Sequence, residues 1–463
     1  MGAEPPVVQI SVRVSTEVLT ANRDCHFSGA YEDGALVVTI DTRTQNVHQR
    51  LGLGTKVKLH WGADNEFMVQ ELSGFLWPIR YRVRTRDGYY LGTDGERVHF
   101  TTAVGGIDAR RGASLVLMRA AVLLVVVAGV GYRRACWLLK ELFHVEVSKS
   151  SLHRWVEEIA ASLPAGDEMI RALNERKPIT EAHFDEIFPR GTDACVLVLK
   201  DEHGRIIATK QVDKRDEATV VPFLERMKGL GLNYKAFYID GCKAYYKAIR
   251  SVFGEAVAIQ YDYFHILQNV WRHLWKWAVA RRRQIKASGE ASTTPWYKKK
   301  LEALSKSLWE NRYVLFKAEE RMTAEEKERL AEMMEAERHV GKLRAFLGGV
   351  WHIFEDSTDE QEARLALAEL KRLSVDREHP EQFRKVVTYL EDHFEWMTAF
   401  LRHDGVKRNS LAESGMRVLR RLEVEHDGFR SEKGRENCLR IYQAVKYLDW
   451  SVHQLPQSEA KSP

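Results

Sequence analysis

The stretch KAFYIDGCKAYYKAI, Lys235 to Ile249, has the pattern of a buried strand that ends on a carboxylate. Apolar residues continue to Ile239, then Asp240 and Gly241 interrupt them, and a helical pattern follows. Asp-Gly is also a common turn sequence, so Asp240 by itself indicates only a turn. It becomes a candidate for chemistry if other carboxylates are brought to the same end of a sheet.

The segment from Glu181 to Asp262 alternates strands and helices around this stretch. Its patterns predict the strands AHFDEIF, ACVLVLK and RIIATKQV, then a helix, the strand KAFYI, a second helix and the strand AVAIQY. The sequence DEHG between the second and third strands is a hairpin signal. The order β-β-β-α-β-α-β predicts a mixed sheet that starts antiparallel and continues after a crossover.

Two carboxylates meet in a sheet of this order. Asp185 lies in the first strand and Asp240 ends the fourth, and we expect these strands to be parallel neighbours. Close carboxylates repel each other unless a cation lies between them, and Mg²⁺ prefers oxygen ligands. Two such ions about 4 Å apart can activate a hydroxyl and stabilise the leaving oxygen of a phosphoryl transfer. We therefore predict a site for two Mg²⁺ (or Mn²⁺) ions.

A third acid is expected to complete the site. Our candidate is Glu413 in RNSLAESGMRVLRR, on a helix that could return to the sheet after a long helical insertion. Each acid also has a purely structural interpretation. Asp185 can cap a strand, and Glu186 beside it competes for the same role. Asp240 can serve only the turn, and a helical glutamate such as Glu413 is commonly solvated.

The region before this segment divides into two parts. Residues 1–105 have a β-rich pattern, in which ALVVTI and YRVRT predict strands and YEDG, TRDG and GTDG predict turns. They contain no catalytic constellation, so we interpret them as a small β domain used for contacts.

Residues 106–165 have the pattern of helices around a short turn. ASLVLMRAAVLLVVVAG predicts a first helix, and YRRACWLLKELFHVEVSKSSLHRWVEEIA predicts helix, turn and helix, with Ser148 as an N-cap. The arrangement predicts a DNA-binding helix-turn-helix, and an ordinary helical hairpin is the alternative. The inward positions are Ala135, Leu138, Leu139, Leu142, Leu152, Trp155 and Val156. The outward face of the second helix offers Lys149, Ser150, Ser151, His153 and Arg154.

Residues 266–404 have a helical pattern throughout, and positive charge is concentrated at their start. The stretch from Ile266 to Lys300 has nine Lys or Arg and one acid, although the whole chain carries a net charge of only +5. Trp271 and Trp275 are spaced to face the core of this insertion. The triplet Arg281, Arg282 and Arg283 is harder to bury, so we expect it either to face water or to hold DNA phosphates.

Composition excludes several classes of protein. The five cysteines are scattered without a CxxC pair, which argues against a disulfide framework and a structural zinc site and fits a reducing compartment. The N-terminus has no signal-peptide pattern. The longest apolar run, Ala120 to Val130, is shorter than the ~20 residues of a membrane span and predicts a buried helix. We expect a cytoplasmic, nucleoid-associated protein without a membrane partner.

The blocks HFDEI, FYIDGCKAY, IQYDYFHILQN and NSLAESGMRVLRRLEVEHDGFR resemble the motif blocks of DDE transposases of bacterial insertion sequences. The resemblance covers roughly residues 130–450. It implies an RNase H-like catalytic core with Asp185, Asp240 and Glu413 in the places of the family's two aspartates and its glutamate. Asp262 and His265 in DYFH resemble a (Cys/Asp)-x-x-His motif that related transposases carry after the fifth strand, and a core histidine that opens the next helix is the alternative for His265.

The resemblance also implies partners and an activity. The partner is double-stranded DNA, as transposon ends and as target, and the activity is Mg²⁺-dependent strand cleavage and strand transfer. Because both transposon ends must be held together, a homo-oligomer of at least two chains is expected. Two alternatives stay open: a transposase-derived DNA-binding protein without mobilising activity, and an RNase H-like nuclease.

The expected fold class is multidomain α/β plus α. An RNase H-like mixed sheet is interrupted by an all-helical insertion and preceded by a helix-turn-helix and a β-rich N-terminal domain. The expected boundaries are 1–105 for the β-rich domain, 106–165 for the helix-turn-helix, 178–265 for the first part of the core, 266–404 for the insertion, 405–455 for the last part of the core with the third acid, and 456–463 for a flexible tail.

Overall fold

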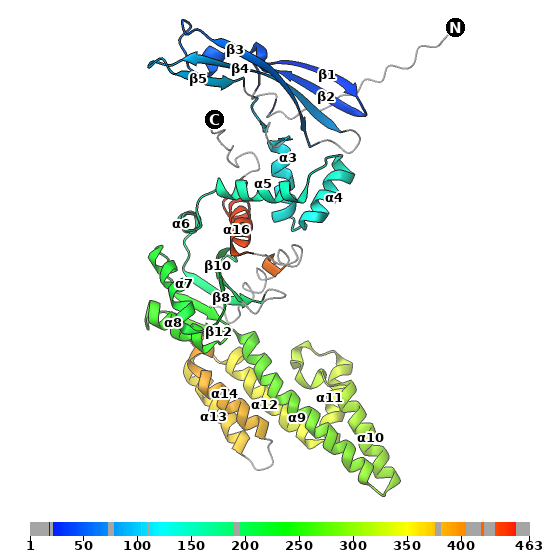
Figure 1. The fold of residues 1–463 in the computed structure, drawn as a ribbon. Helices are drawn as coiled ribbons and strands as arrows, with labels where there is room; N and C mark the ends of the chain where they lie inside the picture. Colours follow the sequence, from blue (N-terminus) through cyan, green and yellow to red (C-terminus); the bar gives the residue numbers. More distant parts are fainter. Residues whose placement is uncertain are drawn as a thin grey trace, which may run out of the picture. The chain divides into compact units, whose positions relative to one another are not determined.

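The computed structural model combines two mixed β-sheets with many helices (Figure 1). It describes residues 18, 22–72, 78–102, 104–108, 112–188, 195–375, 381–403, 418–420 and 431–450. The chain forms two compact units, and each is described by itself. The first comprises Met1–Lys177, Pro189–Gly191 and Arg417–Pro463, and the second comprises Pro178–Phe188 and Thr192–Met416.

The first unit contains the predicted β-rich region as a seven-stranded sheet. Its strand order is β1-β2-β4-β3-β7-β6. Strand β5 pairs with the last residues of β4, beyond those that pair with β2. A 3₁₀ turn, η1 (Thr42–Thr44), and the short helix α2 (Val47–Arg50) follow β2. The strands are β1 (His26–Glu32), β2 (Ala35–Asp41), β3 (His60–Gln70), β4 (Ile79–Leu91), β5 (Arg97–Thr101), β6 (Ile107–Asp108) and β7 (Ala113–Ser114).

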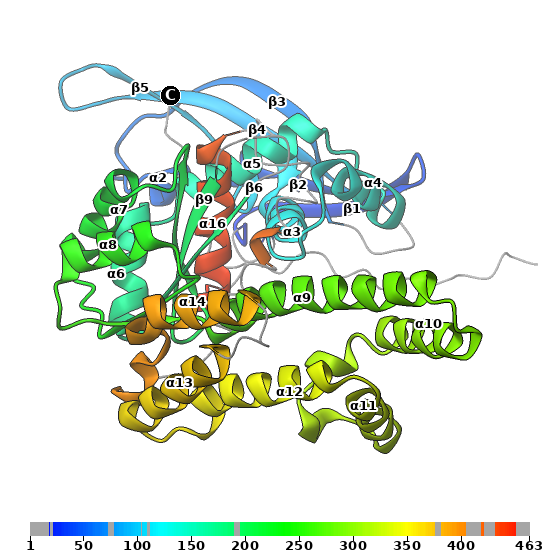
Figure 2. The ribbon, with the colours of Figure 1, turned by 90° about the horizontal axis from the view of Figure 1, so that it is seen from below.

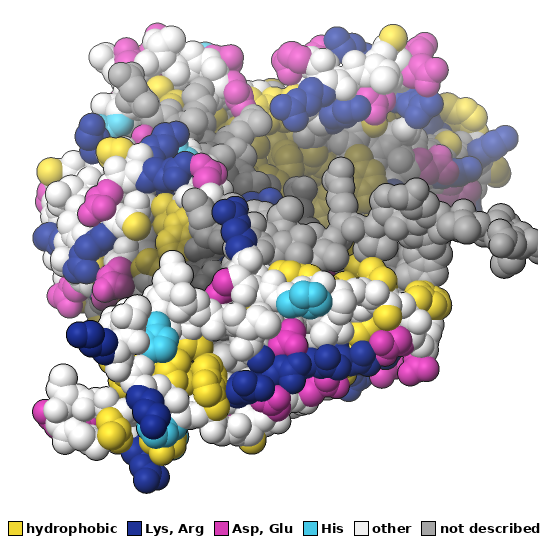
Figure 3. Space-filling model, turned by 90° about the horizontal axis from the view of Figure 1, so that it is seen from above, with side chains coloured by type: hydrophobic (Ala, Val, Ile, Leu, Met, Phe, Trp, Pro, Cys, Tyr) yellow, Lys and Arg dark blue, Asp and Glu magenta, His cyan; other side chains and the backbone are white. Residues whose placement is uncertain are grey.

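Strand β4 shows why this sheet has one buried and one charged face. Tyr81 and Val83 are fully buried, whereas the alternating residues are arginines that pair with acids of neighbouring strands. Arg84 lies 2.7 Å from Glu66, and Arg82 also pairs with Glu66. Figure 3 shows a row of Lys and Arg side chains bordered by Asp and Glu. The neighbouring acids neutralise this row, so it is not a free basic surface.

Two of the three predicted turns in the β-rich region are confirmed, and TRDG is not a turn. YEDG and GTDG connect strands, with Gly34 and Gly95 at φ +76° and +77°. TRDG instead lies inside β4, where Gly88 pairs with Phe100 on one side and Trp61 on the other. A Cβ on Gly88 would lie 2.5 Å from the Phe100 ring. The glycine here therefore allows a close strand contact and does not make a turn.

Helices complete the first unit: α3 (Leu115–Val126), α4 (Tyr132–Phe143), α5 (Lys149–Ala161), α6 (Gly166–Arg176) and α16 (Glu432–Tyr447). The predicted buried helix is α3, and no helix in the described part of the chain is both long and apolar enough to cross a membrane. Helix α16 packs against α3, α5 and α6. It falls in the range 405–455 that we assigned to the catalytic core, and its contacts with these helices put it in the first unit.

The predicted helix, turn and helix are present as α4 and α5, which pack against each other. Ser148 caps α5 as expected, and its side chain accepts a hydrogen bond from Ser151 N at 3.0 Å. One inward position was wrong: Leu142 is exposed. Leu142 lies in the last turn of α4, which ends at Phe143. The next residue, His144, adopts the left-handed conformation (φ 54°), so the chain leaves the helix direction there.

The second unit begins with a five-stranded sheet whose order is β10-β9-β8-β11-β12. Strand β9 is antiparallel to both β8 and β10, and β11 is parallel to both β8 and β12, as the sequence predicts. Phe184 of β8 contacts Phe223 and Tyr245, so α7 and α8 cover one face. The elements are β8 (Glu181–Ile187), β9 (Cys195–Asp201), β10 (Ile206–Val212), α7 (Glu217–Gly229), β11 (Ala236–Ile239), α8 (Lys243–Phe253) and β12 (Ala258–Tyr261).

A helical region follows β12, as expected for residues 266–404. Figure 2 shows the long helix α9 with α10, α12, α13 and α14 around it. Leu274, Phe346 and Phe383 belong to one buried core, and Trp271 packs against it as predicted. The elements are α9 (Tyr263–Ala291), α10 (Pro295–Glu310), η2 (Val314–Phe316), η3 (Glu319–Arg321), α11 (Ala324–Ala336), α12 (Arg338–Trp351), the π-helical turn η4 (His352–Asp356), α13 (Glu360–Val375), α14 (Glu381–Met397) and η5 (Ala399–Leu401).

Candidate active site

The parallel pairing of β8 and β11 brings the two predicted aspartates together. Phe184 is the register partner of Ile239, so the next residue of each strand, Asp185 and Asp240, lie side by side. All four residues of β11 are buried, and the chain turns at once after them. Asp240 Oδ1 accepts a hydrogen bond from Cys242 N at 3.1 Å, which fixes the carboxylate at the turn.

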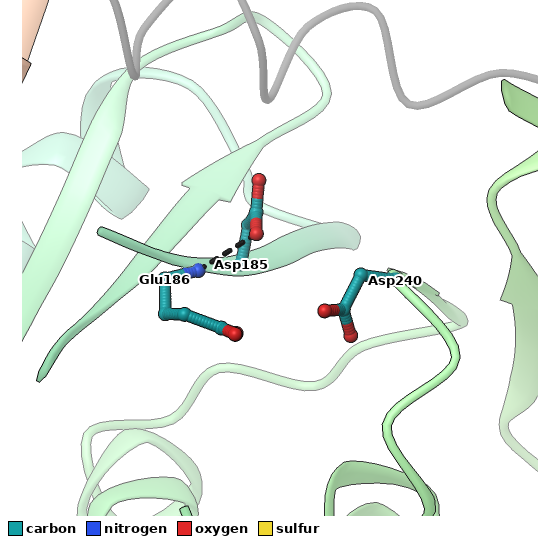
Figure 4. A group of neighbouring side chains, drawn as sticks. All are labelled: Asp185, Glu186 and Asp240. Atoms are coloured by element: carbon teal, nitrogen blue, oxygen red, sulfur yellow. Dashed lines mark hydrogen bonds between the residues drawn. The ribbon is translucent and has the colours of Figure 1, made fainter. Parts of the chain in front are cut away.

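Glu186 is the third acid that the described residues bring to this place. One ligand oxygen from each of Asp185, Glu186 and Asp240 lies within 4.8 Å of the others (Figure 4). Figure 4 shows the carboxylates of Glu186, in β8, and Asp240, directly after β11, pointing toward each other. Asp185 Oδ1 accepts a hydrogen bond from the Glu186 backbone N at 2.8 Å. This cluster of oxygen ligands could hold a divalent metal ion.

The hydrogen bonds separate Asp185 from Glu186. Both oxygens of Glu186 have donors, because Arg215 donates to Oε1 and the Tyr245 hydroxyl donates to Oε2 at 2.5 Å. Asp185 and Asp240 each accept one backbone N–H, and in the described chain their second oxygens have no hydrogen-bond donor. The two aspartates therefore have an oxygen left for a ligand, and Glu186 is held by its neighbours.

The ionisation of the cluster reflects its burial and crowding. Burial raises the pKa of Asp185 to about 7, and the charges of Asp240 and Glu186 contribute to this rise, against the hydrogen bond from Glu186 N. Burial and the charge of Asp240 also raise the pKa of Glu186 above its usual value. A cation among these oxygens would remove the repulsion, so the donor set fits a divalent ion.

Asp262 and His265 lie at the next strand end. Asp262 follows β12 and caps α9, where its side chain accepts from Phe264 N at 3.0 Å. His265 Nε2 lies 4.0 Å from Asp262 Oδ2, and a charged His265 lowers the pKa of Asp185. The imidazole is therefore within electrostatic reach of the acidic cluster. Glu413 lies outside the described residues.

Lys200 is a residue near the site that the sequence analysis missed. It pairs with His183 across β8 and β9 and is 1% exposed. Burial lowers its pKa to about 8, and the charges of Asp201 and Asp185 oppose this shift. The only signal in the sequence is a lysine that continues the apolar run of ACVLVLK, and such a residue is usually expected at the surface.

The residues of the predicted recognition helix differ in exposure. Lys149, Ser150, His153 and Arg154 are exposed on α5, whereas Ser151 is half-buried and belongs to the hydrogen-bonded start of the helix.

The three arginines of α9 also differ. Arg281 is 2.9 Å from the buried Glu337, and Arg282 lies 4.8 Å above the Trp309 ring. Of the three, only Arg283 is exposed. Arg281 and Arg282 therefore have roles inside the helical region, and Arg283 is the member of the triplet that is free to face a partner.

The fold and the acidic cluster define an α/β protein with a candidate metal centre at the ends of two parallel strands. Comparison with known families gives a more specific result: a model of the ISL3-type DDE transposases, described as Transposase, matches residues 183–433, which is more than half of the chain. The chain therefore belongs to this transposase family.

A search of curated proteins finds no match. Among solved structures, the Drosophila P element transposase strand transfer complex is similar over 77% of this chain and 94% of that chain, with a TM-score of 0.33 and 12% sequence identity.

Proposed function

We propose that this chain binds transposon ends and catalyses Mg²⁺-dependent cleavage and transfer of DNA strands. Asp185, Asp240 and Glu413 would hold two divalent ions. Membership of the transposase family supports DNA as the substrate. The observation that carries the proposal is the pair of aspartates on adjacent parallel strands, each with one carboxylate oxygen that has no donor in the described chain.

The topology of the second unit supports an RNase H-like core. Three antiparallel strands are followed by two parallel strands in the order β10-β9-β8-β11-β12, and a long helical region starts directly after β12. In such a core the site lies where β8 and β11 meet. The matched range 183–433 also contains Glu413, on the far side of the helical region in sequence.

The residues of the site have distinct proposed roles. The chemistry that bound divalent ions supply is activation of an attacking hydroxyl and stabilisation of the leaving oxygen. Asp185 and Asp240 hold the ions through their donor-free oxygens. Glu186 is a positioning residue, because Arg215 and Tyr245 occupy both of its oxygens and tie β8 to α8 and to the segment before α7.

End recognition is assigned to α4 and α5. Lys149 and Arg154 are exposed on the face of α5 opposite the buried Leu152 and Trp155, as in a helix that enters the major groove. Both transposon ends must be held in one complex, so the active form is a homo-oligomer of at least two chains.

The decisive experiment incubates the purified protein with Mg²⁺ and a DNA that carries the element's own ends, and measures cleavage and strand transfer. Asp185→Ala, Asp240→Ala and Glu413→Gln should each abolish cleavage and leave DNA binding largely intact. Glu186→Gln is the matched control at the neighbouring carboxyl, and it should keep Mn²⁺ binding, measured by calorimetry, while Asp185→Asn loses it.

The outcomes separate the alternatives. Near wild-type cleavage by any of the three acid variants would remove that residue from the site. DNA binding without cleavage by the wild type would support a transposase-derived binding protein, and cleavage without joining would support a nuclease.

A further inference from the structure

The start of α10, directly after the turn that follows α9, carries an exposed group of aromatic and basic side chains, which we call the hairpin tip: Trp296, Tyr297, Lys298, Lys299 and Lys300. Trp296 is 69% exposed and Tyr297 is 46% exposed. Their rings are 6.4 Å apart, and Lys300 Nζ lies 5.5 Å from the Trp296 ring. Large aromatic side chains that remain this exposed at one place suggest a surface that contacts a partner.

The charge of the hairpin tip is not neutralised by the described part of the protein. Residues 291–300 contain no acid, and Lys298, Lys299 and Lys300 make no ion pair with any described residue. By contrast, Lys286 on α9 and Lys306 further along α10 pair with Glu290 and Glu310.

The local structure does not explain these lysines either. Lys298 lies in the first turn of α10, where the helix dipole makes positive charge unfavourable, and Lys299 and Lys300 follow it directly. A negatively charged partner would offset this cost.

The position of the tip relative to the acidic cluster is set by α9. This helix starts at Tyr263, next to Asp262 and His265, and ends at Ala291. At a rise of 1.5 Å per residue, its 29 residues span about 43 Å. Figures 1 and 2 show α9 and α10 as a hairpin whose turn lies at the end of the helical region away from the five-stranded sheet.

We infer that the hairpin tip contacts the backbone of the duplex whose scissile phosphate lies at the acidic cluster, about one helical turn away. This inference rests on the proposed function and specifies the path of the DNA. About 43 Å corresponds to about 13 base pairs of B-DNA, at 3.4 Å per base pair. The lysines bind phosphates, and the two aromatic rings pack against the adjacent sugars. Phosphate and sugar contacts position DNA without reading its sequence.

The test is the length dependence of DNA affinity in Mg²⁺-free buffer, so that cleavage does not enter the measurement. Wild type should gain affinity when a duplex is extended from about 10 to about 20 base pairs, because only the longer duplex reaches both sites. The variant Lys298→Ala/Lys299→Ala/Lys300→Ala should bind the longer duplex about tenfold or more weakly and the shorter one almost unchanged. The slope of log affinity against log salt concentration should be less steep for the variant, by about 0.9 for each phosphate that it no longer binds.

One further variant is the control and another is a second test of the tip. Lys306→Ala removes a lysine of the same helix that Glu310 neutralises, and it should leave both affinities unchanged. Trp296→Ala should weaken binding of the longer duplex alone.

If the triple-lysine variant binds both duplex lengths equally more weakly than the wild type, or neither more weakly, the inference is overturned. A change in oligomeric state on Trp296→Ala with unchanged DNA affinity would assign the tip to a protein contact and would also overturn it. If the wild type fails to cleave any DNA, the proposed function fails, whereas the length dependence still decides where the duplex lies.

Discussion

Gly241 is the residue on which the position of Asp240 depends most directly, and Gly241→Ala tests this. The backbone of Gly241 has φ +86°, a region that L-residues with a Cβ adopt only at a cost. A Cβ would also lie 2.0 Å from Cζ of Tyr261 and about as close to two more ring atoms. The Tyr261 ring cannot move freely, because it is 3% exposed and its hydroxyl accepts a hydrogen bond from the Tyr389 hydroxyl at 2.8 Å.

The expected magnitude has two parts. Placing alanine in a left-handed conformation costs about 1–2 kcal/mol, and forcing an extra carbon into a packed site costs typically about 1–3 kcal/mol more. Gly231→Ala is the matched control, since Gly231 has φ +84° and no atom within 4 Å of a Cβ. Gly231→Ala should therefore show only the backbone cost, and Gly241→Ala should show both.

Urea unfolding of the three proteins measures this difference through the shift of the midpoint at constant m. Calorimetry with Mn²⁺ should in addition show weaker binding for Gly241→Ala alone, because Asp240 is displaced with the turn. In a Tyr261→Ala background the cost of Gly241→Ala should shrink to that of Gly231→Ala, since the clash is gone. Equal destabilisation by Gly241→Ala and Gly231→Ala in the wild-type background would refute the reasoning.

Further predictions concern the charged side chains of the two units. Arg283→Ala should lower affinity for any DNA and reduce the salt slope by about 0.9, and parallel salt lines of equal height would show that Arg283 only faces water. Arg281→Ala should not act through DNA but should lower the free energy of unfolding by about 1–3 kcal/mol, because it leaves the buried Glu337 without its arginine; a thermal melt measures this. Burial raises the pKa of Glu337, but hydrogen bonds, among them that from Arg281, bring it below its usual value. The wild type should therefore be more stable than Glu337→Gln above about pH 5, and this difference should disappear as the pH falls below about 4. Thermal melts of the two proteins that differ by a constant amount across this pH range would contradict the prediction. Lys149→Ala and Arg154→Ala should weaken binding to transposon ends, by about 1–3 kcal/mol where the side chain reads a base, and unchanged affinity in both would favour a plain helical hairpin.

The order of elements in the second unit follows from the sequence alone. The predicted strands and helices from Glu181 to Asp262 are all present, and the ends of the strands differ from the prediction by at most two residues. The parallel pairing that places Asp185 beside Asp240 is confirmed as well. These features are local: apolar runs, turn residues and short connections restrict the backbone to few arrangements, and a mixed sheet of this order leaves the two strands as neighbours.

The partners of individual side chains were decided by tertiary structure. Nothing in the sequence near Glu186 indicates that Arg215 and Tyr245, 29 and 59 residues away, donate to its oxygens, whereas Asp185 accepts only one hydrogen bond in the described chain. Likewise, Arg281 and Arg283 have similar neighbours in sequence, yet only Arg281 reaches Glu337, 56 residues away.

The physical reason is that hydrogen bonds, ion pairs and burial are short-ranged. Periodicity fixes which face of a helix or strand a side chain occupies, but the donor or acceptor that it meets comes from another element, whose position is set only when the whole unit packs. The same limit explains TRDG, where the turn sequence is local but β3 and β5 pair with β4 on both sides of Gly88 and keep it in the sheet.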